Sequence, residues 1–213
     1  FGLQFGQDYS KLDGSIEYQN EGTNTQVTVE SKEMETFPIG LGGYAFIDLF
    51  GFALEAEGDF AFGEYQFDFI SPSGIPNLEN IPFGWGRVSY AFTLKKNLMD
   101  ISIPILAKAA INAGIGINGH TSTPRANIDM VKEIFEIEDL SEFNPNDNDL
   151  ENELINYLKD NRIDASGFHV QAGLRFKILV LDSHLNFRYT IAENVYDGSN
   201  GFAQAMFKIG MAF

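Results

Sequence analysis

Apolar residues alternate with small or polar residues in eight separate segments of the chain. The clearest are 101–117, where isoleucine or alanine holds every second position, and 203–213, which ends on Phe213. Successive side chains of a β-strand point to opposite faces, so this period of two predicts strands with one apolar and one mixed face. The predicted strands are 1–9, 37–48, 52–69, 87–94, 101–118, 168–177, 184–191 and 203–213. The apolar positions change parity after Gly63, which predicts a β-bulge there.

The connections between these segments alternate between long and short. Tight connections are expected at 49–51, 95–99 and 178–182, and longer ones at 10–36, 70–83, 119–166 and 193–201. This asymmetry is typical of an up-and-down barrel whose tight turns lie at one end. The sequence therefore predicts an all-β protein, a single domain over 1–213 that forms an eight-stranded antiparallel barrel. An even strand number places both termini at the tight-turn end.

The longest connection, 119–166, has helical periodicity of its own. Apolar residues recur at helical spacing over 128–135 and again over 150–158, with the sequence NPNDND between them. Residues 120–166 contain twelve Asp and Glu against four Lys and Arg. We therefore expect an acidic, partly helical insertion over one mouth of the barrel.

Composition excludes several classes of protein. The chain has no cysteine, so it has neither disulfides nor thiolate metal sites. A net charge of −16 argues against a nucleic-acid partner. There is no apolar run of about 18 residues that would predict a transmembrane helix. Because the sequence starts at Phe1 without methionine, we expect a mature chain from which a leader has been removed.

The mixed face of the strands indicates which face points inward. It is rich in Gly, Ala, Ser and Asn, and its charges are complementary in sign, as expected for a narrow, closed interior. The predicted interior network is Glu55, Glu57, Asp59, Arg87, Lys108, Arg175, Arg188 and Lys208. Aromatic residues near the strand ends predict two interfacial girdles. These are Phe50, Phe52, Phe176 and Phe213 at the tight-turn end, and Tyr65, Phe67, Phe69, Phe83, Trp85, Phe168 and Tyr189 at the other.

These features favour a transmembrane barrel over a soluble secreted β-barrel binding protein, which stays open as an alternative. The chain resembles the small eight-stranded outer-membrane β-barrels of the OmpA/OmpW-like porin family. Met211 and Phe213 match the terminal positions of that family's insertion signal, while Lys208 stands where a glycine often precedes them. The resemblance implies a bacterial outer membrane, extracellular long loops and periplasmic termini. It also implies contact with lipopolysaccharide, the barrel-assembly machinery and other envelope proteins.

No catalytic, cofactor or metal residues are predicted. His169 and His184 fall on the interior face without an evident third ligand, and His120 lies beside Thr121 and Ser122 without a complete triad. The sequence NPNDND lacks the glycine and the glutamate spacing of a calcium loop. We expect a non-enzymatic membrane protein with a filled interior that anchors its acidic insertion. The alternative is a narrow channel for small hydrophobic molecules.

Overall fold

The fold is one large antiparallel sheet with two short helices. A computed structural model describes residues 1–21, 25–70, 77–103, 106–134 and 150–213. The strands are β1 Gly2–Asp8, β2 Ser15–Glu21, β3 Thr25–Ser31, β4 Ile39–Leu49, β5 Phe52–Ile70, β6 Leu78–Ile103, β7 Ala107–Ser122, β8 Ile163–Ile178, β9 Leu181–Ile191 and β10 Phe202–Met211. The helices are α1 Ile128–Ile134 and α2 Leu150–Asp160.

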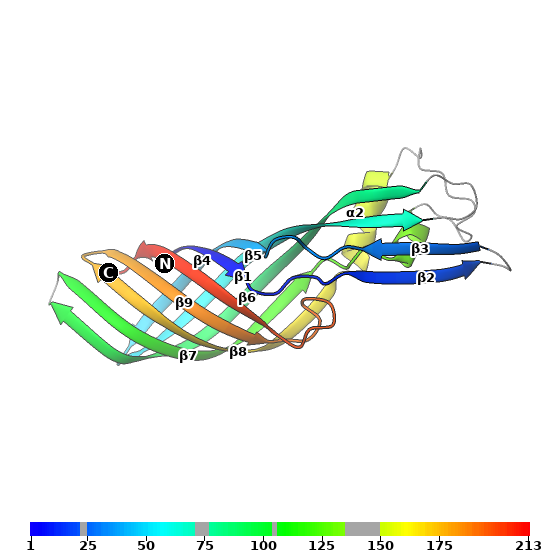
Figure 1. The fold of residues 1–213 in the computed structure, drawn as a ribbon. Helices are drawn as coiled ribbons and strands as arrows, with labels where there is room; N and C mark the ends of the chain where they lie inside the picture. Colours follow the sequence, from blue (N-terminus) through cyan, green and yellow to red (C-terminus); the bar gives the residue numbers. More distant parts are fainter. Residues whose placement is uncertain (22–24, 71–76, 104–105, 135–149) are drawn as a thin grey trace.

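Eight of the ten strands close the sheet into a ring. The order is β5-β4-β1-β10-β9-β8-β7-β6, and β6 pairs again with β5 (Figure 1). The remaining strands, β2 and β3, extend the sheet from the far end of β5. The expected all-β antiparallel class is confirmed, with two strands that the periodicity missed. The chain ends meet as expected, because the amino group of Phe1 donates to the carbonyl of Met211 at 3.0 Å.

The closed sheet is strongly staggered. A line drawn across the strands from Lys96 of β6, through successive residue pairs, returns to β6 at Gly86, ten residues away. Closure with such a stagger requires tilted strands. A strand spacing of about 4.8 Å and a rise of about 3.3 Å per residue give a tilt of roughly 40°.

The two longest strands reverse their polarity along their length. In β5, Glu55 and Glu57 face the interior up to Ala61, and beyond it the same face carries Tyr65 and Phe67. The pairing of β5 with β6 runs without interruption from Phe52 to Phe67. The bulge predicted at Gly63 is therefore wrong. The apolar side chains change from the outer to the inner face without any change in the backbone register.

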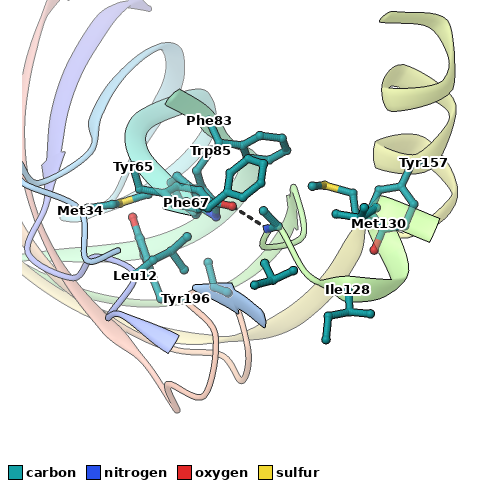
Figure 2. Close-up of a cluster of buried hydrophobic side chains, with 14 of the residues drawn as sticks. Leu12, Met34, Tyr65, Phe67, Phe83, Trp85, Ile128, Met130, Tyr157 and Tyr196 are labelled. Carbon is teal, nitrogen blue, oxygen red and sulfur yellow. Dashed lines mark hydrogen bonds between the residues drawn. The ribbon is translucent and has the colours of Figure 1, made fainter. Parts of the chain in front are cut away.

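This reversal marks the start of a second part of the molecule, into which β5 and β6 continue. We call it the cap and define it as the described parts of 10–36, 63–86 and 123–162. Its inner face forms the main apolar core, which packs β3, β5 and β6 against α1 and α2 (Figure 2). Five aromatic residues assigned to an outer girdle lie in this core and not on the outer surface, namely Tyr65, Phe67, Phe69, Phe83 and Trp85. Phe168 and Tyr189 do face outward.

The tight turn predicted at 95–99 is also wrong. β6 continues through these residues to Ile103, and the register shift between Asn97 and Met99 is a bulge within the strand. The bulge moves the outward positions from even numbers to odd ones, which explains the change of parity between Leu94 and Ile101. Residues 104–105 lie outside the described part of the chain.

In the structure, the 10–36 and 119–166 connections differ in content or length from those expected. The 10–36 connection contains the β2–β3 hairpin, and the long insertion runs only from 123 to 162, since β7 ends at Ser122 and β8 starts at Ile163. Both expected helices are present, whereas the sequence NPNDND lies in residues left undescribed. Neither α1 nor α2, nor any other helix among the residues covered, is long and apolar enough to cross a membrane.

Closure of the sheet depends on the pairing of β1 with β10, which a cross-link tests. Phe5 and Phe207 face each other across this seam, and both side chains point outward. Because the chain has no cysteine, the double variant Phe5→Cys/Phe207→Cys should oxidise to a single intramolecular disulfide. Gel mobility with and without reductant measures it. The out-of-register pair Phe5→Cys/Phe213→Cys should stay reduced, and equal oxidation of both pairs would contradict the seam.

Candidate functional site: the charged interior of the closed sheet

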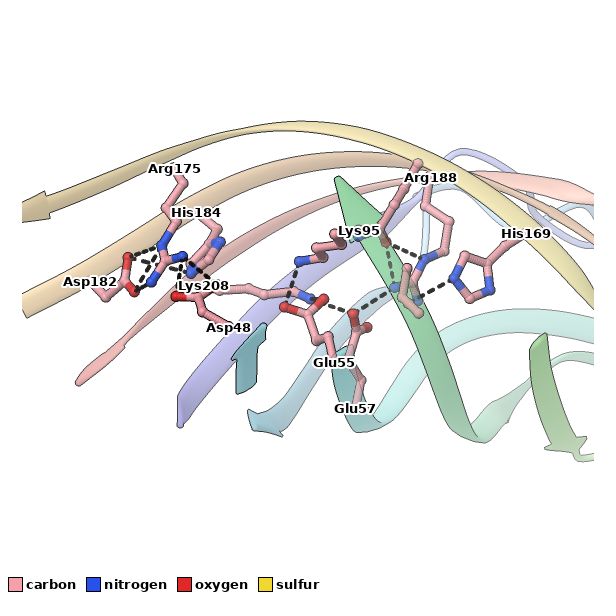
Figure 3. A network of polar contacts seen from close by, with 12 residues as sticks. Asp48, Glu55, Glu57, Lys95, His169, Arg175, Asp182, His184, Arg188 and Lys208 are labelled. Carbon is pink, nitrogen blue, oxygen red and sulfur yellow. Dashed lines mark hydrogen bonds and ion pairs between the residues drawn. The ribbon is translucent and has the colours of Figure 1, made fainter. Parts of the chain in front are cut away.

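The interior of the closed sheet contains three clusters of charged side chains along its length, two of which are drawn in Figure 3. Eleven ionised side chains take part, six acidic and five basic. They are Asp8, Asp48, Glu55, Glu57, Asp59 and Asp182 with Arg87, Lys95, Arg175, Arg188 and Lys208. The charges nearly cancel although the whole chain carries −16.

The cluster nearest the tight turns is centred on Arg175 of β8. Its guanidinium donates to both carboxylate oxygens of Asp182, with the closest contact at 2.6 Å, and to Asp48 at 2.9 Å. Asp48 is on β4, four strands away around the ring, so this contact crosses the full width of the interior. The guanidinium carbon also lies 4.6 Å from the ring centre of Phe46.

The central cluster joins two adjacent carboxylates of β5 to three cations from other strands. Lys208 Nζ lies 2.8 Å from Glu55 and 2.5 Å from Glu57. Lys95 approaches Glu55 at 2.5 Å, and Arg188 approaches Glu57 at 2.6 Å. Since β9 is opposite β5 in the ring, the Arg188–Glu57 pair also spans the interior.

The cluster nearest the cap is centred on Arg87, which is only 1 % exposed. It contacts Asp8 at 2.8 Å and Asp59 at 3.0 Å. The hydroxyl of Tyr196, in the loop between β9 and β10, also donates to Asp8. Burial, followed by the nearby charge of Asp8, raises the pKa of Tyr196, so its phenol stays a donor.

An aromatic layer covers this last cluster and joins it to the cap. The ring of Tyr196 stacks on Trp85 with centroids 4.7 Å apart, and it meets Phe202 edge to face. Tyr65 lies in the same core, and its oxygen accepts a bond of 2.7 Å from the amide of Ala126 (Figure 2). Burial raises the pKa of Tyr65 to about 12. The polar interior therefore ends beneath this layer of aromatic side chains, which we call the aromatic seal.

Seven of the eight residues predicted for the network lie in these clusters, and Lys108 does not. Its side chain is at the rim of the tight-turn end, where its nearest carboxylate is Asp100 at 3.9 Å. Four charged members were missed by sequence reasoning: Asp8, Asp48, Lys95 and Asp182. Each has the interior parity of its strand. Asp8 and Asp48 already lie within predicted strands, whereas Lys95 and Asp182 lie one and two residues beyond them, so reading the parity of the mixed face to the true strand ends would have found all four.

The histidines are separate members of the interior. His169 contacts Thr93 at 2.9 Å and Asn118 at 3.2 Å, whereas His184 lies beside Asp182. They occupy ladder positions six residues apart, which is about 20 Å along the strands, so they cannot share a ligand. Within the described ranges, no three His, Asp or Glu side chains are placed to hold a metal ion.

His120 lies beside the hydroxyl of a serine, as His169 lies beside that of Thr93. The Nδ1 of His120 lies 2.9 Å from Ser89 Oγ, and both side chains are buried in the interior. Thr121 faces away from it and donates to Asp164. The arrangement supports hydrogen bonding across the interior; a triad would need a carboxylate on His120, and none bonds it in the described part of the chain.

Met211 and Phe213, the predicted insertion signal, lie at the outer surface of the tight-turn end. Met211 is 50 % exposed and Phe213 is 92 % exposed, while Ala212 between them is buried. Their position is compatible with recognition by another molecule. Their role as a signal remains a prediction.

The charge clusters should make Arg87 indispensable for stability. Arg87→Met leaves the buried carboxylates of Asp8 and Asp59 without a cation, which should cost about 3–5 kcal/mol in the free energy of unfolding. Denaturant unfolding measures this cost.

Two surface cations and one rescue serve as controls for that variant. Arg162→Met and Lys108→Met remove exposed or rim charges, and both should stay within about 0.5 kcal/mol of the wild type. Adding Asp8→Asn and Asp59→Asn to Arg87→Met should recover part of the loss. If all three single variants were equally destabilised, the electrostatic explanation would be wrong.

A comparison with known proteins adds no assignment to this geometry: no protein-family model matches the chain, and no curated protein matches it significantly. Functional inference therefore depends on the arrangement of the residues themselves.

Proposed function

We propose that the chain is an integral β-barrel of a bacterial outer membrane that anchors its cap at the surface. The observation that carries this proposal is the polarity reversal within β5 and β6. In the ring their outer faces are apolar and their inner faces carry charged side chains. In the cap both strands are apolar inside, and the outer face of β5 is polar, with Glu64, Gln66 and Asp68. A lipid environment around the ring and water around the cap account for both arrangements.

The height of the apolar outer surface supports the proposal. Strand after strand carries about eleven residues of outward apolar side chains, as in 52–62, 168–178 and 181–191. With a rise of about 3.3 Å and a tilt of roughly 40°, eleven residues span about 25 Å along the ring axis. Transmembrane barrels have an apolar band of about 25 Å.

The composition of this apolar outer band also supports the proposed membrane location. Of the outward-facing side chains on the ring within that height, Lys96 is the only charged one in the described chain, and it lies at the tight-turn edge. Phe187, near mid-height, is 58 % exposed. A water-exposed sheet of this size would carry charges across its whole outer face, since these prevent edge and surface aggregation.

The interior supports an anchoring role over diffusion. Side chains from strands three or four places apart around the ring meet at hydrogen-bonding distance at three levels, and the aromatic seal lies above them. Eight-stranded rings are narrow enough for side chains to fill. The proposal includes the orientation expected from the resemblance, with the cap extracellular, the termini periplasmic, lipopolysaccharide around the cap side, and the barrel-assembly machinery acting on the final strand.

A charge placed on the outer surface tests the membrane assignment. Phe187→Arg puts a guanidinium near the middle of the apolar band, which should cost about 2–4 kcal/mol in a bilayer. Gln66→Arg places the same group on the outer face of the cap, where water is expected, and should cost almost nothing. Assembly into lipid vesicles, followed by flotation and by the mobility shift on heating, measures both. A wild-type chain that stays monodisperse in buffer without any amphiphile would disprove the assignment.

Conductance separates an anchor from a channel. In planar bilayers the wild-type protein should show no steady ion current, because its charge pairs and aromatic seal occupy the interior. Steady openings at the nanosiemens scale would exclude the filled interior and favour the narrow-channel alternative. The same assay on Tyr196→Ala compares the conductance with and without the aromatic seal, since this variant loses the stacking on Trp85 and the bond to Asp8.

A further inference from the structure

The sheet of the cap has an open edge at β2. This strand pairs with β3 on one side, and no described strand pairs with its other side (Figure 1). It contains neither proline nor lysine, the residues that most often protect an edge, and Ile16 and Tyr18 are exposed. The opposite edge of the cap sheet is the upper part of β6, where Pro82 lacks a backbone donor. β2 is therefore the less protected of the two edges.

The strand register decides which backbone groups of β2 face this open edge. The N–H of Lys32 donates to the carbonyl of Gln66 on β5 at 2.7 Å, so Lys32 and every second residue before it turn their backbone groups towards β5. The alternate residues of β3 turn towards β2, where they are opposite Ser15, Glu17 and Gln19. The N–H and C=O groups of Ile16 and Tyr18 consequently point to the open edge. An added strand would bond to them.

This edge lies clear of the apolar band and is held in place by α1. Tyr18 is on the ladder row of Thr28 and Ile70, well beyond Phe62 at the top of the band. With a rise of about 3.3 Å and the tilt of the ring, that separation is roughly 20 Å. The carboxylate of Glu17 accepts a bond of 3.2 Å from the amide of Ile128, where α1 begins. The open edge is thus accessible from outside the membrane.

We propose that β2 pairs antiparallel with β2 of a second copy of this chain, and that this pairing joins two membranes that face each other. The inference rests on the proposed surface anchoring of the cap. With Tyr18 opposite Tyr18, all seven residues from Ser15 to Glu21 are paired, and the open backbone groups of each copy meet those of the other. Glu17 is then opposite Gln19, so this register opposes no like charges.

Other registers of the two strands are less favourable. The alternation of open and bonded backbone groups allows only shifts by two residues. A shift in one direction places Glu17 opposite itself, and a shift in the other places it opposite Glu21. Both shifts leave only the central part of the strands paired, and like charges directly opposite destabilise a ladder. The sequence of β2 is therefore complementary to itself in one register.

The symmetry of this pair determines which copies can form it. A two-fold axis that relates antiparallel strands is perpendicular to them. Because β2 runs along the length of the molecule, this axis places the two rings at opposite ends of the pair (Figure 1). Copies in two apposed membranes satisfy this geometry, whereas copies in one membrane do not. A pair of seven-residue strands is a small interface, so firm joining depends on many copies acting together.

A cross-link tests the register in the full chain. In the proposed pair the two Tyr18 residues are directly opposite, with Cα atoms about 5.5 Å apart, so Tyr18→Cys should oxidise to a dimer that reductant dissolves. Thr28→Cys is the matched control, since it is on the same face of the neighbouring strand and roughly 14 Å from its counterpart. It should stay monomeric on a non-reducing gel. Equal dimerisation of both variants would exclude the register.

Clustering of vesicles tests the joining of membranes. Phosphatidylcholine vesicles that carry the wild-type chain should cluster, which dynamic light scattering measures as a rise in apparent size. Tyr18→Pro removes the N–H at the open edge and leaves the ladder to β3 intact, so clustering should fall to the level of protein-free vesicles. Tyr18→Val removes the same ring but keeps the N–H, and its clustering should persist. Equal loss in both variants would contradict strand pairing.

The remaining outcomes separate a second copy from other occupants and this inference from the membrane location. Capture of protein-free vesicles by protein-bearing ones would show that the cap binds lipid and not a second copy. Protein that floats with vesicles but neither clusters them nor cross-links through Tyr18→Cys contradicts the pairing alone. Protein that does not float contradicts the membrane location, and the joining of membranes is then excluded with it.

Discussion

The structure depends on keeping its ionised side chains away from its apolar outer surface. Each interior charge lies within hydrogen-bonding distance of an opposite charge, often one from the far wall of the ring. Burying an unpaired charge costs more than the whole stability of a typical domain can offset. Closure of the sheet is what brings these partners together, since Arg175 and Asp48 or Arg188 and Glu57 are on opposite strands and are far apart in sequence. Closure also leaves the outer surface free to be almost entirely apolar.

In the cap, the inner face of β5 and β6 is apolar and no longer charged. Beyond Ala61, the inner face of β5 no longer meets a charged wall but an apolar core contributed by β3, α1 and α2. Tyr196 and Trp85 lie at the boundary between the charged interior of the ring and the apolar core of the cap, so the interior network ends beneath an aromatic layer. At this junction the described parts of the insertion pack against β3, β5 and β6 in one apolar core. The proposed anchoring role depends on this one reversal in polarity.

Two errors of sequence interpretation have a common physical cause. Alternation reports only which residues share a face, and it does not report what that face meets. At Gly63 the strand pairing is continuous, and the apolar side chains change face because the surroundings of the strand change. At 95–99 the strand also continues, but a bulge inserts one residue and so shifts the apolar positions from even to odd numbers. From the sequence alone the first looks like a bulge and the second like a turn. The girdle assignment of Phe67 and Trp85 failed for the same reason, since both are apolar strand residues whose side chains face a core.

The amino-acid sequence by itself determined the β class, the ring of alternating strands, the meeting of the termini, the two helices of the insertion and seven of the network residues. These follow from local periodicity, which depends on the geometry of a single strand. Tertiary structure alone decided which carboxylate pairs with which cation, that Lys108 stays at the rim, and that β2 and β3 add a second layer. Those features depend on the stagger of the closed sheet, which sets the positions of residues on opposite walls and has no counterpart in any single segment of the chain.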